Sequence, residues 1–122
     1  MDIRLISLDM DGTLYANNGK IPEINIRALR ECHKRGIYVM LNSGRSFESL
    51  CGTEETLGVP CIISSANGAR VDMDGKTVSE TVIEYELSRE TRELLINSGC
   101  YFCAYARSTT YMFNLAERRA GR

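Results

Sequence analysis

The sequence predicts an α/β fold, in which part of a three-layer parallel sheet is followed by the beginning of an α+β unit. Over the first half of the chain, short apolar runs of strand length alternate with segments of helical spacing. This alternation predicts right-handed crossovers between parallel strands. After about residue 69 the pattern changes to hairpins around one helix, so we expect a first unit over residues 1–83 and a second over residues 84–122.

Three strands and two helices account for the first half of the chain. The strands are predicted from apolar runs such as IRLISL, which suit a buried parallel sheet. The first helix is predicted from apolar residues at helical spacing, with a proline in its first turn and a glycine at its end. In chain order we expect a strand at residues 3–8, a helix from Pro22 to Gly36, a strand at residues 37–42, a second helix that the segment SGRSFESL (residues 43–50) leads into and that ends near Gly58, and a strand at residues 61–65.

The second half predicts two hairpins and a helix. The first hairpin turns at Asp74-Gly75, a frequent two-residue turn sequence. A helix is expected over residues 88–99, with Ser88 as its N-cap and Gly99 at its C-terminal end. Two further strands follow at residues 100–106 and 109–114. Their alternating aromatic residues indicate packing of a small sheet rather than a substrate cage.

Composition restricts the class of protein. The chain has 122 residues, of which 43% are hydrophobic and 25% charged, which is typical of a globular domain with a core. A net charge of −1 provides no field for nucleic acid or an anionic membrane. No apolar run is long enough to span a bilayer and no signal peptide is evident. We therefore expect a cytoplasmic protein.

The five cysteines are scattered and odd in number, which argues against a disulfide framework. Cys100 and Cys103 form a CxxC pair. A zinc site would need two more ligands, and the single histidine, His33, is far away in sequence. A redox pair would open a helix, whereas this one lies in a predicted strand, so we expect both thiols to be small buried residues.

The tetrapeptide Asp-Met-Asp-Gly occurs twice, and only the first copy has the context of a site. Asp9 and Asp11 directly follow a predicted buried strand and lie on the same side of an extended segment. Two adjacent carboxylates can divide the work of nucleophile and proton carrier. Asp72 and Asp74 fall between two short strands, where aspartate commonly forms turns. The first copy is therefore the candidate site, and the second is interpreted as turn structure.

Three polar segments follow the three predicted parallel strands. They read DMDGT, NSGR and SANGA. The carboxyl ends of parallel strands meet at one edge of a sheet, and ligands of such sheets bind there. The sequence therefore predicts that these segments converge on one site.

These segments resemble motifs of the haloacid dehalogenase (HAD) superfamily. LDMDGTL around Asp9 resembles its first motif, DxDGT, and NSGR at residues 42–45 resembles its second. SANGA at residues 65–69 is similar to a segment of the Cof-type branch (cap type IIB), in which a cap is inserted after the third strand. The resemblance implies a Rossmann-like HAD core over residues 1–83 and a partial α+β cap over residues 84–122.

The resemblance also implies a Mg²⁺-dependent phosphatase acting on a small phosphorylated metabolite, for instance a sugar phosphate. Asp9 would form an aspartyl-phosphate, while Asp11 would protonate the leaving oxygen and then activate water. Ser43 and backbone N–H groups near Gly44 would bind the phosphoryl oxygens, with the Thr13 hydroxyl close by. Mg²⁺ would bind the Asp9 carboxylate and the Asp11 carbonyl, since a hard cation reduces the repulsion between carboxylate and phosphate.

Two further positions keep two interpretations each. Arg45 either contacts phosphate or substrate, or lies on the surface in the first turn of a helix. Asn67 either orients Asp9 or touches the substrate, or forms a left-handed turn before Gly68.

The lysine of the third HAD motif and the acidic pair of the fourth, which follow the cap in the family, are not matched here. The lysines are Lys20, Lys34 and Lys76, and the chain ends in NLAERRAGR. We therefore expect the N-terminal part of a Cof-type phosphatase, with severely reduced activity on its own. The alternative is a catalytically incomplete fragment that binds metal or phosphate weakly, or that self-associates through the edge of its truncated sheet.

Overall fold

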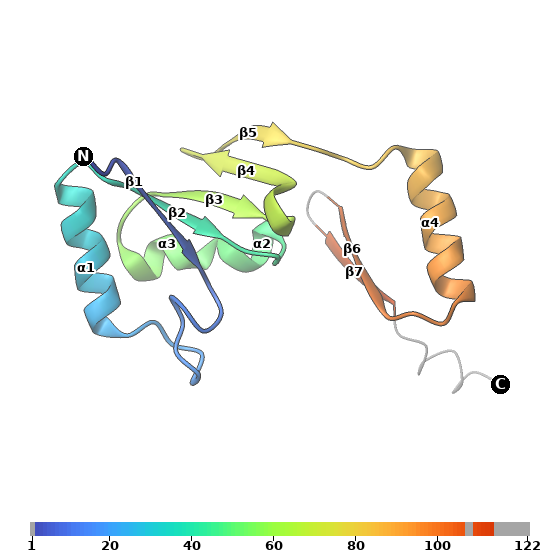
Figure 1. Ribbon diagram of the computed structural model, residues 1–122, viewed down its shortest axis with the longest axis horizontal. Coiled ribbons are helices and arrows are strands. Elements are labelled where there is room, and N and C mark those ends of the chain that lie inside the picture. The colour runs from blue at the N-terminus through green and yellow to red at the C-terminus, as the bar shows by residue number, and fades with distance from the viewer. Residues whose placement is uncertain (1, 107–108, 114–122) are drawn as a thin grey trace. The chain divides into compact units, whose positions relative to one another are not determined.

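The chain consists of two compact units, Met1–Thr81 and Val82–Arg122, each with its own sheet. A computed structural model describes residues 2–106 and 109–113 (Figure 1). The first unit has a five-stranded sheet in the order β1-β2-β3-β4-β5, and the second has a two-stranded sheet, β6-β7.

The parallel part of the first sheet follows the predicted order of strands and helices. β1 pairs with β2 and β2 pairs with β3, both in parallel. The second predicted helix is divided into two short helices around Cys51. The elements are β1 (Leu5–Asp9), α1 (Glu23–Lys34), β2 (Tyr38–Asn42), α2 (Phe47–Leu50), α3 (Gly52–Leu57) and β3 (Cys61–Ser65).

Local chemistry sets the ends of α1 and α3. Pro22 is the N-cap residue of α1, where its φ of −60° is compatible with the helix and its missing N–H is not needed. Gly36 follows α1 with φ +76°, and Gly58 follows α3 with φ +67°. Both are left-handed conformations that end a helix at little energetic cost for glycine.

A hairpin extends the sheet beyond β3. After a short 3-10 turn, η1 (Ala66–Gly68), β4 (Arg70–Met73) pairs antiparallel with β3, and β5 (Lys76–Glu80) pairs antiparallel with β4. Asp74 and Gly75 have φ values of +52° and +71°, the signature of a two-residue type I′ turn. The predicted hairpin therefore exists, and it joins the main sheet, which is mixed rather than wholly parallel.

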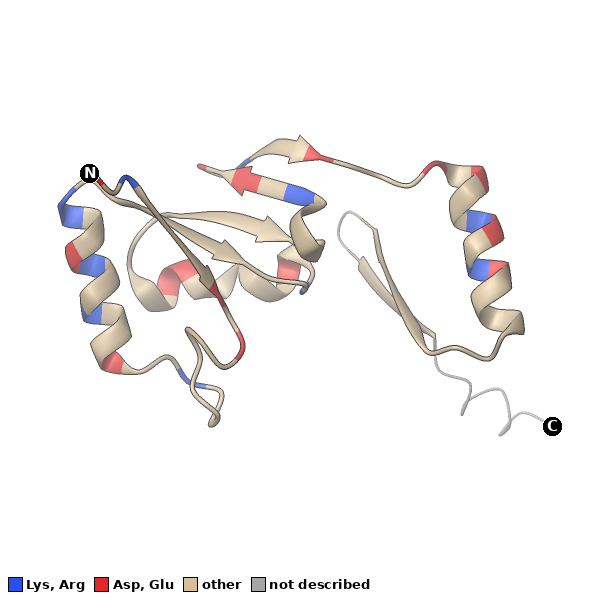
Figure 2. Cartoon of the chain, in the orientation of Figure 1, with Lys and Arg blue, Asp and Glu red and all other residues tan. Residues whose placement is uncertain are grey.

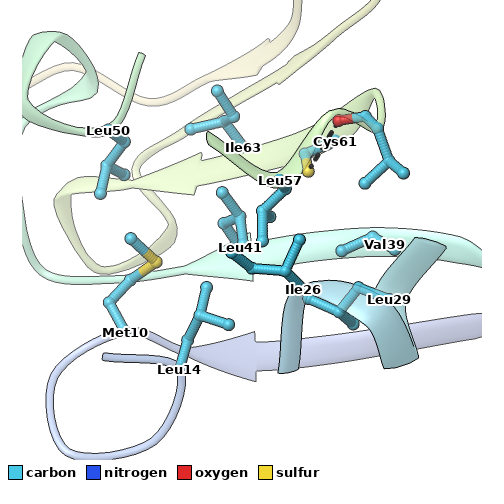
Figure 3. Packing of buried hydrophobic residues seen from close by; sticks show 11 residues of the cluster. Met10, Leu14, Ile26, Leu29, Val39, Leu41, Leu50, Leu57, Cys61 and Ile63 are labelled. Carbon is cyan, nitrogen blue, oxygen red and sulfur yellow. Dashed lines mark hydrogen bonds between the residues drawn. The ribbon is translucent and has the colours of Figure 1, made fainter. Parts of the chain in front are cut away.

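The hydrophobic core lies between this sheet and the helices (Figure 3). Alternate residues of β2 and β3, including Val39, Leu41 and Ile63, are buried, as the period of two in a strand requires. The helices contribute apolar side chains from the other side. The remaining core residues are Met10, Leu14, Ile26, Leu29, Leu50, Leu57, Val59 and Cys61.

The described helices of the first unit cover one face of the sheet. α1 contacts both β2 and α3, so α1 and α3 share a face. Residues of alternate parity point to the other side, where Leu5 is 46% exposed and Tyr38 58% exposed. The described residues thus form two of the three predicted layers, namely the sheet and one layer of helices.

The second unit contains one helix and one hairpin. α4 (Tyr85–Asn97) begins three residues before the predicted Ser88, with Glu84 as its N-cap, and Gly99 follows its end with φ +75°. β6 (Phe102–Ala106) pairs antiparallel with β7 (Thr109–Phe113), and the rings of Phe102 and Phe113 stack at 4.5 Å. Asn114, the last residue of the second predicted strand, lies outside the described residues.

The predicted burial of the CxxC pair is wrong. Cys100 and Cys103 are both exposed, because the hairpin leaves most of its residues open on both faces. Cys61 is the buried thiol, and burial raises its pKa to about 12, so it acts as a core residue.

Charge is mixed along the helices of both units. Acidic and basic positions occur together on α1 and on α4 (Figure 2). None of the helices in the described ranges is both long and apolar enough to cross a membrane.

Candidate active site

The carboxyl ends of the three parallel strands lie in line. Asp9 is the register partner of Asn42, and Asn42 is the partner of Ser64. The Ser64 hydroxyl donates to Oδ1 of Asn42 at 2.9 Å, which ties β3 to β2 at this edge. The segments that follow these strands therefore start side by side.

The first Asp-Met-Asp-Gly segment turns its carboxylates outward. Met10 is fully buried, whereas Asp9 and Asp11 on either side of it are exposed. Burial of a methionine stabilises by roughly 1.5–3 kcal/mol, which is enough to fix this orientation. The chain then turns at Gly12, whose φ is +79°.

Backbone and side-chain hydrogen bonds close this turn. The Leu14 N–H donates to the Asp9 carbonyl at 3.2 Å, and the Tyr15 N–H donates to the Met10 carbonyl at 2.8 Å. The Thr13 hydroxyl donates to Oδ2 of Asp9 at 3.5 Å, a weak contact that keeps the hydroxyl next to the carboxylate. Thr13 thus lies beside Asp9, as expected from their spacing.

Ser43 is buried in the loop after β2. Its N–H donates to the Ser64 carbonyl at 3.0 Å, and its Oγ accepts the Arg45 N–H at 3.2 Å. Because Oγ acts as an acceptor in that bond, its hydroxyl hydrogen remains to be donated to an anion.

The loop after β3 supports the Ser43 loop through its backbone. The Asn67 N–H donates to the Ser43 carbonyl at 3.1 Å, and the Ala66 N–H donates to the Arg45 carbonyl at 2.8 Å. A Cβ atom at Gly44 would lie 2.8 Å from Oδ1 of Asn67, so only glycine fits without movement. Of the interpretations of Asn67, the structure shows the left-handed turn, with φ +57°, and it joins Asn67 to the Ser43 loop.

The left-handed turn begins one residue earlier than expected. Ala66 has φ +49°, a conformation that costs a residue with a Cβ roughly 1–2 kcal/mol. The two backbone hydrogen bonds to the Ser43 loop hold this strained turn in place.

The Arg45 side chain contacts Asp11 of the first Asp-Met-Asp-Gly segment. Its Nε donates to Oδ2 of Asp11 at 3.0 Å and its Nη2 donates to Oδ1, so the guanidinium binds both carboxylate oxygens. The guanidinium carbon also lies 5.9 Å from the centre of the Tyr15 ring. The two paired side chains remain 44% and 62% exposed, and exposed pairs contribute only about 0–1 kcal/mol to stability.

An open hollow of about 460 Å³ adjoins this ion pair. Tyr15 was not predicted as a site residue, because a lone tyrosine in a loop forms no sequence pattern. Its hydroxyl shares a 3.2 Å hydrogen bond with the Thr53 hydroxyl. The residues that line the hollow are Asp11, Gly12, Tyr15, Ala16, Asn17, Gly19 and Arg45.

The oxygen atoms near Asp9 suit a hard cation. A carboxylate and a backbone carbonyl are the ligand types that Mg²⁺ accepts, and Mg²⁺ commonly retains water and uses few protein ligands. Within residues 2–106 and 109–113, no group of three or more His, Cys, Asp or Glu side chains could hold a metal ion.

The second Asp-Met-Asp-Gly segment has a different role. Asp72 is buried, and it accepts hydrogen bonds from Arg70 Nε at 2.7 Å, Arg70 Nη2 at 2.9 Å and the Thr77 hydroxyl at 2.8 Å. The bonds from Arg70 hold the pKa of Asp72 below its ordinary value, against the opposing effect of burial. Asp74 forms the turn as predicted, but the prediction of a turn role for Asp72 is wrong.

The Asp72–Arg70 pair also connects to the helix after the Ser43 loop. The Arg70 guanidinium lies 4.1 Å from the centre of the Phe47 ring, at the start of α2. The second copy therefore stabilises the fold next to the candidate site.

The model of the haloacid dehalogenase-like hydrolase family matches residues 6–120. The chain belongs to this family. Phosphatase YwpJ of Bacillus subtilis is 28% identical over 110 residues, which cover 89% of this chain and 39% of YwpJ. The 5-amino-6-(5-phospho-D-ribitylamino)uracil phosphatase YcsE of the same organism is 35% identical over 71 residues, covering 58% of this chain and 28% of YcsE.

Solved structures share the fold. A haloacid dehalogenase-like hydrolase from B. subtilis superimposes with a TM-score of 0.84 at 28% identity, covering 95% of this chain and 41% of the other. The expected HAD-like α/β fold is therefore confirmed. The chain spans less than half the length of these relatives.

Proposed function

We propose that this chain carries the nucleophile and phosphate-binding half of a Mg²⁺-dependent HAD phosphatase. The observation that supports this most is the outward-facing Asp9–Asp11 pair at the end of β1, beside the end of β2, which the buried Ser43 follows. Membership of the HAD-like hydrolases and the phosphatase names of the relatives support the same reaction.

In the proposed reaction, an Asp9 carboxylate oxygen attacks the phosphorus of a phosphate monoester. The bond from phosphorus to the ester oxygen breaks as Asp11 transfers a proton to that oxygen. Water then attacks the aspartyl-phosphate, Asp11 accepts a proton from the water, and inorganic phosphate leaves. The Ser43 hydroxyl and nearby backbone N–H groups, including that of Gly44, hold the phosphoryl oxygens throughout.

We propose that Mg²⁺ is held by the Asp9 carboxylate and the Asp11 backbone carbonyl. When bound, it supplies positive charge that allows an anionic nucleophile to approach an anionic phosphate. The hard oxygen donors support this assignment.

The substrate in this proposal is a small phosphorylated metabolite, for instance a sugar phosphate. The name of YcsE describes a phosphorylated ribityl compound as the substrate of that relative. A cytoplasmic location completes the proposal, and it is supported by five free cysteines.

Hydrolysis of p-nitrophenyl phosphate by the full chain tests this function. Because the lysine of the third motif and the acidic pair of the fourth are not matched in this chain, we expect slow turnover that requires Mg²⁺, disappears on addition of EDTA, and returns when Mg²⁺ is restored. Asp9→Asn should abolish it, while Asp74→Asn, a matched change in the second copy, should leave it intact. Mg²⁺-dependent turnover that is equal in wild type and Asp9→Asn would refute the assignment.

The alternative is a fragment that binds phosphate or metal without turnover. It predicts no metal-dependent rate in this assay, together with phosphate binding in a separate titration. Self-association through the β1 edge remains part of this alternative, since β1 pairs only with β2 among the described strands. Sedimentation velocity of wild type and Leu5→Lys would detect it as association that the edge lysine weakens.

A further inference from the structure

The side chains of Arg45 and Asp11 form an ion pair with each other in this structure. Both oxygens of the Asp11 carboxylate accept hydrogen bonds from the Arg45 guanidinium, across 34 residues of sequence. Asp11 is the group that the proposed function assigns to proton transfer. While both its oxygens face Arg45, neither faces a leaving group.

Arg45 is also attached to the phosphate-binding loop. Its backbone N–H donates to Oγ of Ser43, the hydroxyl proposed to bind phosphate. Its side chain faces the open hollow, with 44% of its surface exposed. The long Arg45 side chain therefore has a second anionic partner available within the same site, a phosphate group bound at the Ser43 loop.

Charge favours the replacement of Asp11 by a phosphate as the partner of Arg45. A guanidinium forms bidentate hydrogen bonds with both carboxylates and phosphates, and a phosphate monoester carries the greater negative charge. The existing pair is solvent-exposed and therefore weak, whereas the Arg70–Asp72 pair has side chains only 21% and 6% exposed and a third hydrogen bond from Thr77.

We infer that the Arg45–Asp11 ion pair is a latch that the substrate phosphate opens. In the free protein Arg45 holds Asp11; an incoming phosphate takes over the guanidinium, and Asp11 is released towards the leaving-group oxygen. This inference rests on the proposed phosphatase function and adds a substrate-controlled step to it. Arg45 is thus a positioning residue for Asp11 as well as a phosphate ligand.

Arginine Nε–H resonances in ¹H–¹⁵N spectra of the full chain provide the direct test. Titration with inorganic phosphate and Mg²⁺ should shift the Arg45 signal with the same dissociation constant as phosphate binding itself. The Arg70 signal should stay in place, because its partner Asp72 is buried; it is the matched internal control. Saturable phosphate binding with an unmoved Arg45 signal would overturn the latch while leaving the proposed function intact.

A double-mutant cycle measures the competition. Asp11→Asn should tighten phosphate binding by roughly three- to tenfold, because Arg45 is released. In an Arg45→Met background, the same change should have a clearly smaller effect. Equal effects in both backgrounds would refute the latch, and an absence of saturable phosphate binding together with no hydrolysis would refute both the latch and the proposed function.

Discussion

In the first Asp-Met-Asp-Gly segment the methionine is buried and both aspartates are exposed, whereas in the second the first aspartate is buried and the methionine is 38% exposed. The period of two in a strand explains the first case: Met10 continues the inward alternation of Ile6 and Leu8. In the second case the strand carries a register shift between Val71 and Asp72, and Asp72 lies on the inner side.

The difference between the copies shows that the partners of a carboxylate decide whether it is available to bind a ligand. Asp72 has three hydrogen bonds from protein donors and is buried with them, so it cannot approach a substrate. Asp9 has one weak contact with Thr13 and faces solvent at the edge where ligands of α/β sheets bind.

After the complete loss expected for Asp9→Asn, the largest effect should come from Asp11→Asn, which removes the proposed proton carrier. We expect kcat/KM for an alkyl phosphate, which reports the first phosphoryl transfer and not the later hydrolysis of the intermediate, to fall by roughly 10²–10⁴-fold. The loss should be much smaller for an aryl phosphate with a very acidic leaving group, because that oxygen needs no protonation. Steady-state kinetics with both substrates measures this. A loss independent of the leaving group, or an equal loss in Asp74→Asn, would contradict the assigned role.

Asp72→Asn should lower the stability of the fold and not the rate of the reaction. It removes two charge-assisted hydrogen bonds to Arg70 in a mostly buried site, and we expect the free energy of unfolding to fall by roughly 2–3 kcal/mol. Asp74→Asn is the matched control, since asparagine tolerates the left-handed turn and should change stability by less than about 0.5 kcal/mol. Urea unfolding monitored by circular dichroism would show both. Equal stabilities for the two variants would remove the structural distinction within the second copy.

The stabilisation by Asp72 should depend on pH in a defined direction. The pKa of Asp72 in the folded protein lies below its ordinary value of 3.8. Its contribution is therefore fully present above that ordinary value and is lost as the pH falls through the folded-state pKa. The difference in unfolding free energy between wild type and Asp72→Asn should shrink between pH 6 and pH 3. A difference that stays constant or grows would show that the ionised carboxylate is not the stabilising group.

The smallest effect concerns the contact between the loops after β2 and β3. In Gly44→Ala the new Cβ atom would meet Oδ1 of Asn67, and we expect about 1 kcal/mol of destabilisation. The same change in an Asn67→Gly background should be nearly neutral, since the obstructing side chain is gone. Thermal unfolding of the four variants tests this, and a full additive loss in the double variant would exclude the contact as the cause.

Much of the fold could be predicted from local patterns. The strands, the breaks at Gly36 and Gly58, and the Asp74-Gly75 turn all depend on residues that are neighbours in sequence. Strand ends in a parallel sheet also predict which loops meet, which is why Asp9, Ser43 and Asn67 were expected at one edge.

Features were missed or predicted wrongly where the structure depends on contacts between distant residues or on competing local signals. Nothing in the sequence pairs Arg45 with Asp11 or brings Arg70 over Phe47, because these contacts depend on side-chain reach in the folded sheet. Ser88 looked like an N-cap, yet the helix starts earlier, after Glu84. Burial of the CxxC pair was inferred from strand pattern alone, which does not show what covers the strand.

The most direct test of the central claim is to locate the phosphoryl group on the chain. Trypsin cleaves after Arg4 and Lys20 and after Arg70 and Lys76, so the two copies fall in separate peptides, residues 5–20 and 71–76. After acid quenching of the chain during turnover with Mg²⁺ and an aryl phosphate, mass spectrometry should find one phosphoryl group on the first peptide, and none in Asp9→Asn. Phosphorylation of the second peptide, or turnover with no label on the first under conditions that preserve acyl phosphates, would contradict the account.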